Sequence, residues 1–99
     1  MFYIYVLQSE KTDQYYIGHT DDSERRIKEH NESQHLTFTS KHRPWKLMAS
    51  IPIGNSRGEA MRVEKYIKRK KRKSYIESII ENQTQGLFIK ELIRHSLAG

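Results

Sequence analysis

The sequence predicts a small α/β domain, in which a three-stranded, antiparallel-type sheet is flanked by helices in the order β-β-α-β-α-α-α. Two observations point to the sheet: the β-branched and aromatic runs at residues 2–7 and 15–20, and an alternating run at residues 45–53. A third points to the helices. Apolar residues recur at helical spacing after residue 56.

Composition limits the class of protein. A chain of 99 residues, 35% of them hydrophobic, forms one domain with a modest core and little room for a large internal cavity. It has no cysteine, which leaves out a disulfide framework and a thiolate site. No apolar run approaches the roughly 20 residues of a membrane span. The first ten residues lack a basic leader segment, so we expect a soluble cytoplasmic protein.

Positive charge is concentrated in one segment. The formal net charge is +6, and residues 57–73 hold nine Lys or Arg against two Glu, a net of +7. Such a local field attracts polyphosphates before any specific contact forms. A solvated cationic helix or a targeting signal explains a run of this kind equally well.

The first two strands are predicted to pair with each other. Seven residues separate residues 2–7 from residues 15–20, too few for a parallel crossover, so the pairing is antiparallel. Both faces of residues 2–7 are largely apolar, which predicts a central strand covered on both sides.

Residues 21–31 predict a short helix. Asp21, Asp22 or Ser23 can cap its first turn, and its apolar stripe is essentially Ile27. Arg26 and His30 are four residues apart and therefore project from one face. A helix with so little apolar surface is suited to presenting polar groups.

The middle of the chain predicts a loop, a strand and a second helix. Residues 31–44 are polar and without clear periodicity, and Pro52 ends the third strand or places it at an edge. Ser56 and Glu59 have capping-box spacing and open a helix that runs into the basic segment. Glu64 lies directly beside the apolar stripe of this helix.

Two further helices are predicted after the basic segment. Ser74 and Glu77 repeat the capping-box spacing and predict one start, and apolar residues between 88 and 97 predict the last helix. We expect residues 1–80 to form the functional domain and residues 81–99 a helical extension that packs on it or trails from it.

Taken singly, the candidate residues have ordinary structural explanations. A strand tyrosine is usually half buried, Arg26 can pair with Asp22, and Glu64 can pair with Lys68 at i, i+4. The histidines show no metal-ligand spacing, so zinc is not favoured.

Taken together, they resemble the GIY-YIG nuclease family. The matching pieces are "YIYVL", "YYIGHT", "RRIKEHN", "TSKHRPW" and "RVEKYIK", which cover roughly residues 2–75. The resemblance is to the small stand-alone members of the family. One departure is in the first triplet, Tyr3-Ile4-Tyr5, which has a tyrosine where the name-giving glycine would fall.

The resemblance implies a metal-dependent endonuclease that cleaves DNA by structure rather than sequence, in repair or recombination. The implied catalytic residues are Tyr5, Tyr16, Arg26, His30 and Glu64. Glu64 would hold one Mg²⁺ or Mn²⁺ ion. Arg26 would stabilise charge on the phosphate, and either tyrosine could take the proton of the attacking water if cationic neighbours lower its pKa.

Further cationic residues are expected to contact the DNA backbone without reading its sequence. They are His19, Lys41, Arg43, Lys65, Lys68, Arg69, Lys70 and Lys73. The partner is therefore nucleic acid, most simply DNA, near the nucleoid if the cell is bacterial. Two alternatives stay open: a non-catalytic nucleic-acid-binding module on the same fold, and a protein whose basic helix docks an acidic partner.

Overall fold

The computed structural model describes residues 1–32 and 37–98. The strands are β1 (Phe2–Ser9), β2 (Tyr15–Thr20) and β3 (Trp45–Gly54). The helices are α1 (Ser23–Glu32), α2 (Thr37–Ser40), α3 (Arg57–Lys70), α4 (Lys73–Glu81) and α5 (Gly86–Ala98). The predicted order is confirmed, and the four-residue α2 adds a helical turn to the connection predicted as a loop. Residues 33–36, which belong to the predicted loop 31–44, lie outside the described residues.

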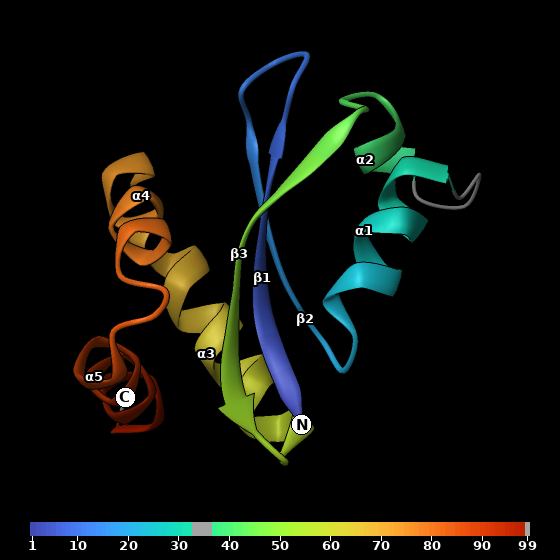
Figure 1. Ribbon diagram of the computed structural model, residues 1–99. Helices are drawn as coiled ribbons and strands as arrows, with labels where there is room; N and C mark the ends of the chain where they lie inside the picture. The colour runs from blue at the N-terminus through green and yellow to red at the C-terminus, as the bar shows by residue number, and fades with distance from the viewer. Residues whose placement is uncertain (33–36, 99) are drawn as a thin grey trace.

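The sheet has the order β2-β1-β3, and both pairings are antiparallel. β1 is therefore central, as its two apolar faces predicted. Tyr5 lies opposite Gly18 of β2 and Ser50 of β3. Figure 1 shows α1 on one side of the sheet and α3, α4 and α5 on the other.

Each face of the sheet carries its own buried cluster because side chains alternate along β1. Ile4 and Val6 join residues of α3, α4 and α5 in the larger cluster. Tyr5 and Leu7 join Trp45 in the smaller cluster, against which Ile27 of α1 packs. The smaller cluster is the aromatic one, and it forms the base of the candidate site.

Two of the predicted helix starts are confirmed by the structure, and one is wrong. Asp22 Oδ1 accepts a hydrogen bond from the Arg25 amide at 3.1 Å, and Ser56 Oγ accepts one from the Glu59 amide at 3.2 Å. The capping box predicted at Ser74 is wrong. Helix α4 begins at Lys73, and its N-cap residue makes no side-chain hydrogen bond.

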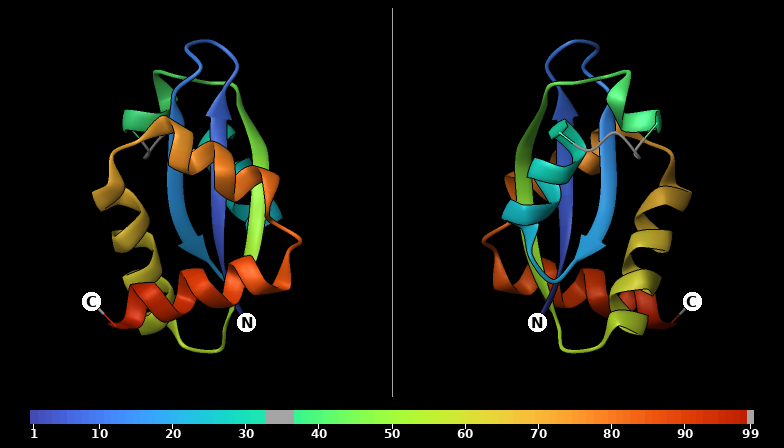
Figure 2. Two further views of the ribbon diagram at one scale, coloured as in Figure 1. Left: turned by 90° about the vertical axis from the view of Figure 1, so that its left-hand side faces the viewer. Right: turned by 90° about the vertical axis from the view of Figure 1, so that its right-hand side faces the viewer.

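The basic segment is not one continuous helix. α3 ends at Lys70, its C-cap residue Lys71 has a left-handed backbone with φ of 51°, and α4 starts at Lys73 in a new direction. Figure 2 shows the two helices meeting at an angle beside the sheet. The cations of this segment therefore point in several directions instead of forming a single stripe.

The C-terminal helix α5 lies against α3 and contributes Leu92 to the larger cluster. Arg62 of α3 donates a hydrogen bond to the Leu97 carbonyl at 2.6 Å, which ties the end of α5 down. A domain boundary near residue 80 stays a prediction. In the described residues, no helix combines the length and the apolar character needed to cross a membrane.

Candidate active site

Tyr5 sits at the centre of the sheet and is only 2% exposed. Its ring lies against Gly18 of the neighbouring strand, which is its register partner. A Cβ atom at residue 18 would stand 2.3 Å from the Tyr5 hydroxyl oxygen. The glycine of "YIG" is therefore the residue that leaves room for this ring.

The Tyr5 hydroxyl joins two side chains of α1. It shares a 3.0 Å hydrogen bond with His30 Nε2, and Arg26 Nε donates to it at 3.3 Å. The i, i+4 spacing of Arg26 and His30 places both on the face of α1 that looks at the sheet. Arg26 pairs with a carboxylate, as its ordinary explanation expects, but the partner is Glu29 at 3.2 Å instead of Asp22.

Tyr16 completes this aromatic group. Its ring centre lies 4.7 Å from that of His30 and 6.3 Å from that of Tyr5. Trp45 of β3 meets it at 6.2 Å, edge to face. The structure thus brings four of the five predicted catalytic side chains together on the α1 face of the sheet.

The end of α1 is held in place by two polar contacts. The Asn31 side chain donates a hydrogen bond to the Trp45 carbonyl at 3.0 Å and accepts one from the Trp45 amide at 2.6 Å. It thus pairs with both main-chain groups of Trp45, as the backbone of a neighbouring strand would. Arg43 Nε donates to the His30 carbonyl at 2.7 Å. These contacts fix His30, and with it the orientation of the Tyr5 hydroxyl.

The expected lowering of the tyrosine pKa is wrong for Tyr5. Burial raises the pKa of Tyr5 to about 12, and the hydrogen bond and charge of Arg26 do not offset it. Loss of hydration penalises the phenolate more than one guanidinium stabilises it. Tyr5 is therefore a neutral hydrogen-bonding group at neutral pH.

His30 is also neutral. It is fully buried, and burial lowers the pKa of its imidazole to about 4, with the charges of Arg26 and Arg43 adding to the effect against Glu29. Its Nδ1 has no hydrogen-bond partner in the part of the chain that the structure describes. A buried polar atom without a partner costs stability, which suits a residue retained for a function.

Glu64 comes from α3 and is held by two cations. His19 Nδ1 lies 2.7 Å from Oε1, and Lys68 Nζ lies 2.8 Å from Oε2. The second pair is the i, i+4 contact expected from the sequence. Burial alone raises the pKa of Glu64, but the hydrogen bonds from Lys68 and His19 outweigh it and the net pKa is lowered. The carboxylate is thus ionised at neutral pH.

Glu64 lies on α3 and contacts His19, which leaves β2 on the side opposite to Tyr16. β2 is an edge strand, and α3 runs beside it. The Lys68 ammonium that pairs with Glu64 also lies 5.6 Å from the centre of the Tyr16 ring. Lys68 is therefore the residue that links Glu64 to the aromatic group.

The donor set fits a hard cation that keeps most of its water. Within residues 1–32 and 37–98, no three His, Cys, Asp or Glu side chains converge into a metal cluster. One ionised carboxylate beside a phosphate is enough for Mg²⁺ or Mn²⁺, which accept water as ligands. A single carboxylate does not provide the three or four protein ligands that zinc takes.

The predicted DNA-contacting residues are dispersed. Lys68 faces Glu64, Lys73 Nζ lies 5.8 Å from the Tyr15 ring, and Lys70 Nζ lies 4.7 Å from the Tyr66 ring. Lys41 is exposed just after α2, and Arg43 has the structural contact described above. Lys65 and Arg69 are exposed on α3, where both border a hollow that includes Glu64.

The sequence interpretation missed the contact between His19 and Glu64. It treated His19 as a phosphate ligand, but the structure pairs it with Glu64 and puts its Nε2 3.4 Å from Arg57 Nη1. The signal was available in the alternation of β2. His19 has the opposite parity to Tyr16, so it faces α3 instead of α1.

Comparison with known proteins places the chain in a family. The family model described as "GIY-YIG catalytic domain" matches residues 1–77, which include β1 to α3 and all five candidate residues. No solved structure matches the chain.

Curated relatives match over most of their length. A "UPF0213 protein" of Streptococcus pneumoniae serotype 4 is 39% identical over 85 residues, which cover 86% of this chain and 84% of the relative. The "UPF0213 protein YazA" of Bacillus subtilis is 33% identical over 91 residues, 89% of each chain. A third, the "UPF0213 protein YsiG" of Lactococcus lactis, is 35% identical over 82 residues, 82% of this chain and 76% of the relative.

Proposed function

This chain belongs to the GIY-YIG family, whose catalytic domain is a nuclease fold, and we propose that it is a metal-dependent DNA endonuclease. It hydrolyses phosphodiester bonds in DNA chosen by structure rather than sequence, in repair or recombination. It acts in the cytoplasm, at the nucleoid in a bacterial cell. The observation that carries the proposal is the network of Tyr5, Arg26 and His30, with the ionised Glu64 on α3, the helix along the edge of the same sheet.

Arg26 binds the phosphate in this proposal. Its guanidinium stays charged at every working pH, and its planar fork of donors matches phosphoryl oxygens. Tyr5 and Glu29 hold it from two sides, which fixes its direction before the substrate arrives. Fixed donors of this kind stabilise the charge that develops in the transition state without a reorganisation cost.

Tyr16 is the better candidate for the base that takes a proton from the attacking water. Tyr5 is buried, its pKa is about 12, and its hydroxyl is engaged by Arg26 and His30. Tyr16 is only partly buried and has the Lys68 ammonium near its ring. We assign Tyr5 and His30 to positioning, since they order Arg26 and the Tyr16 ring.

Glu64 is the residue that holds the divalent cation. When bound there, Mg²⁺ or Mn²⁺ supplies positive charge that neutralises the phosphate. The exposed cations, Lys65 and Arg69 among them, grip the DNA backbone and bring it to the site.

A metal-dependent cleavage assay tests the proposal. Pure protein is incubated with duplex, flap, Holliday-junction and single-stranded DNA, with Mg²⁺, with Mn²⁺ and with a chelator. We expect cleavage that needs the metal and is lost in Glu64→Ala and in Tyr16→Phe. Glu81→Ala, which removes an exposed carboxylate at the end of α4, is the matched control and keeps full activity. Activity that survives both site substitutions contradicts the assignment.

One observation favours the alternative of a binding module without catalysis. Both Glu64 oxygens are already paired with side chains, those of His19 and Lys68. If these pairs are permanent, no metal enters. Salt-sensitive DNA binding without cleavage on any of the four substrates, with either metal, would establish that reading.

A further inference from the structure

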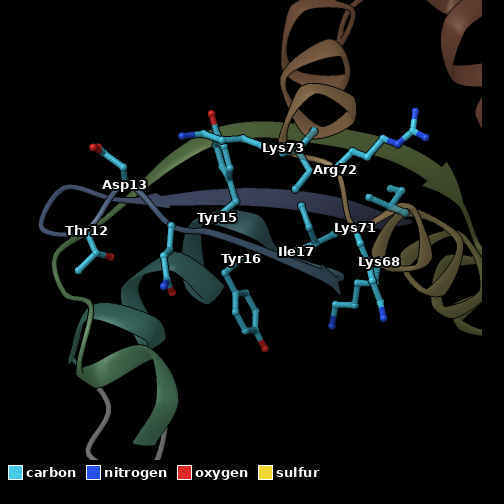
Figure 3. Close-up of a pocket in the computed structure, with 12 residues that line it drawn as sticks. Thr12, Asp13, Tyr15, Tyr16, Ile17, Lys68, Lys71, Arg72 and Lys73 are labelled. Atoms are coloured by element: carbon cyan, nitrogen blue, oxygen red, sulfur yellow. The ribbon is translucent and has the colours of Figure 1, made fainter.

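A cavity of about 600 Å³ lies beside the candidate active site, along the outer edge of β2. It is bounded by the loop between β1 and β2, by β2 itself and by the junction of α3 with α4 (Figure 3). Its volume falls in the range of roughly 300–1,000 Å³ that is typical of small-ligand sites. Tyr16 and Lys68 line it, so it is continuous with the site.

The rim of this cavity is cationic. Four cationic side chains and one carboxylate line it, a net of +3, which suits a polyanion. The cations are Lys68, Lys71, Arg72 and Lys73, and the carboxylate is Asp13. Figure 3 shows Lys73 beside Tyr15, Lys68 and Lys71 on the side of Tyr16, and Arg72 extending away.

The floor of the cavity is apolar and aromatic. Ile17 and Ile67, 5% and 2% exposed, form its base together with Ile76. Tyr15 and Tyr16 leave β2 on opposite sides and stand at its two margins (Figure 3). A nucleotide suits both features, because each one carries a phosphate for the cations and a flat base for this floor.

We infer that this cavity binds one unpaired nucleotide of a DNA strand, with its base on the apolar floor beside Tyr15 and its phosphates on Lys71 and Lys73. Apolar surface, an aromatic ring and nearby ammonium groups are the combination that holds single-stranded nucleic acid. A base within a duplex has its faces covered by its neighbours and cannot use the floor.

The inference rests on the proposed function and narrows its substrate. Lys68 lines the cavity and also contacts Glu64, so the unpaired nucleotide lies next to the phosphate at the site. The preferred DNA therefore carries a single-stranded segment where it leaves a duplex. Recognition of this kind selects structure and tolerates any base sequence.

Binding is measured on the wild-type chain in a chelator, so that no cleavage occurs. The two ligands are a blunt duplex and the same duplex with a single-stranded overhang. The affinity of the protein for each is measured by fluorescence anisotropy. We expect roughly tenfold tighter binding of the overhang. A 2-aminopurine at the first unpaired position should change its fluorescence on binding, and one inside the duplex should not.

Two variants remove the cavity's features without disturbing the fold. Tyr15→Leu keeps apolar contact with the core cluster but loses the ring. Lys71→Asn with Lys73→Gln removes two charges, and Asn tolerates the left-handed backbone at residue 71. The matched control is Lys28→Gln with Lys90→Gln, which removes two exposed charges outside the cavity.

Both cavity variants should lose the preference for the overhang, and the control should keep it. Equal binding of blunt and overhang DNA by the wild type, or a preference that survives both cavity variants, overturns the inference. Metal-dependent cleavage in the same preparation would then leave the proposed function standing. Loss of cleavage in every condition, with the overhang preference intact, would instead remove the proposed function and keep the cavity.

Discussion

The ring of Tyr5 and the α-carbon of Gly18 are in contact across two hydrogen-bonded strands, so closely that no side chain fits between them. This contact sets where the Tyr5 hydroxyl lies, and that hydroxyl in turn meets Arg26 and His30. Gly18 therefore affects the site indirectly, by leaving the space that positions the Tyr5 ring.

Gly18→Ala tests this dependence. The added Cβ must push the Tyr5 ring away, which we expect to cost about 1–3 kcal/mol of unfolding free energy. Displacing Arg26 by about 1 Å should slow cleavage by roughly 100-fold. Denaturant unfolding and a cleavage time course measure the two effects. Gly58→Ala is the control, because a Cβ there would meet Ser56 Oγ only at 3.7 Å, and it should leave cleavage unchanged.

The buried His30 makes stability depend on pH. Its pKa is about 4 in the folded chain against 6.5 ordinarily, so between these values the unfolded chain binds a proton that the folded chain does not. The contribution of the neutral His30 to the free energy of unfolding is fully present above pH 6.5. It is lost as the pH falls towards 4, where the free energy of unfolding is lower by roughly 3 kcal/mol. Urea unfolding at pH 7 and pH 4.5 measures it. A drop as large in His30→Gln as in the wild type would show that other groups cause it.

The roles of the two tyrosines are separable by pH–rate profiles. If Tyr16 is the base, the cleavage rate should rise with pH in the wild type and in Tyr5→Phe, and should be low and flat in Tyr16→Phe. Loss of a general base costs about 100- to 10,000-fold. Single-turnover rates between pH 6 and pH 10 provide the measurement. A flat profile in Tyr5→Phe would assign the base to Tyr5 despite its pKa of about 12.

Lys68 and a divalent cation compete for Glu64. Removing the ammonium with Lys68→Met should tighten Mn²⁺ binding, because Oε2 loses its present partner. Calorimetric titration of Mn²⁺ measures the change, and Glu64→Gln should bind no Mn²⁺ at this site. Lys65→Met removes a neighbouring exposed charge that has no contact with Glu64 among the described ion pairs, and should have little effect. Weaker Mn²⁺ binding in Lys68→Met would contradict the competition.

Salt dependence tests the exposed cations of α3. Each lysine or arginine that neutralises a phosphate steepens the dependence of log K on log salt by about one. Lys65→Gln with Arg69→Gln should therefore lower the slope by about two for any DNA. The double variant Lys28→Gln with Lys90→Gln should keep the wild-type slope. An unchanged slope in the first variant would place the DNA on another surface.

Local patterns in the sequence determined the elements and their order. The alternation of residues 2–7 and the short connection to residues 15–20 were enough to predict a central strand in an antiparallel pair. The caps at Asp22 and Ser56 followed from short-range hydrogen bonding, which depends on neighbours in the chain. The cap predicted at Ser74 failed because the left-handed turn at Lys71 starts α4 two residues earlier, with Arg72 at the N-cap position and Lys73 as its first residue.

The sequence by itself also determined which side chains of the first helix act together. Arg26 and His30 are four residues apart on one helix, so they must share a face. What only the tertiary structure decided is the environment of each group. The pKa of Tyr5 depends on how much water its ring loses, and the state of Glu64 depends on His19, which lies 45 positions away along the chain. Burial and long-range contacts arise from the folded arrangement as a whole, so no local pattern contains them.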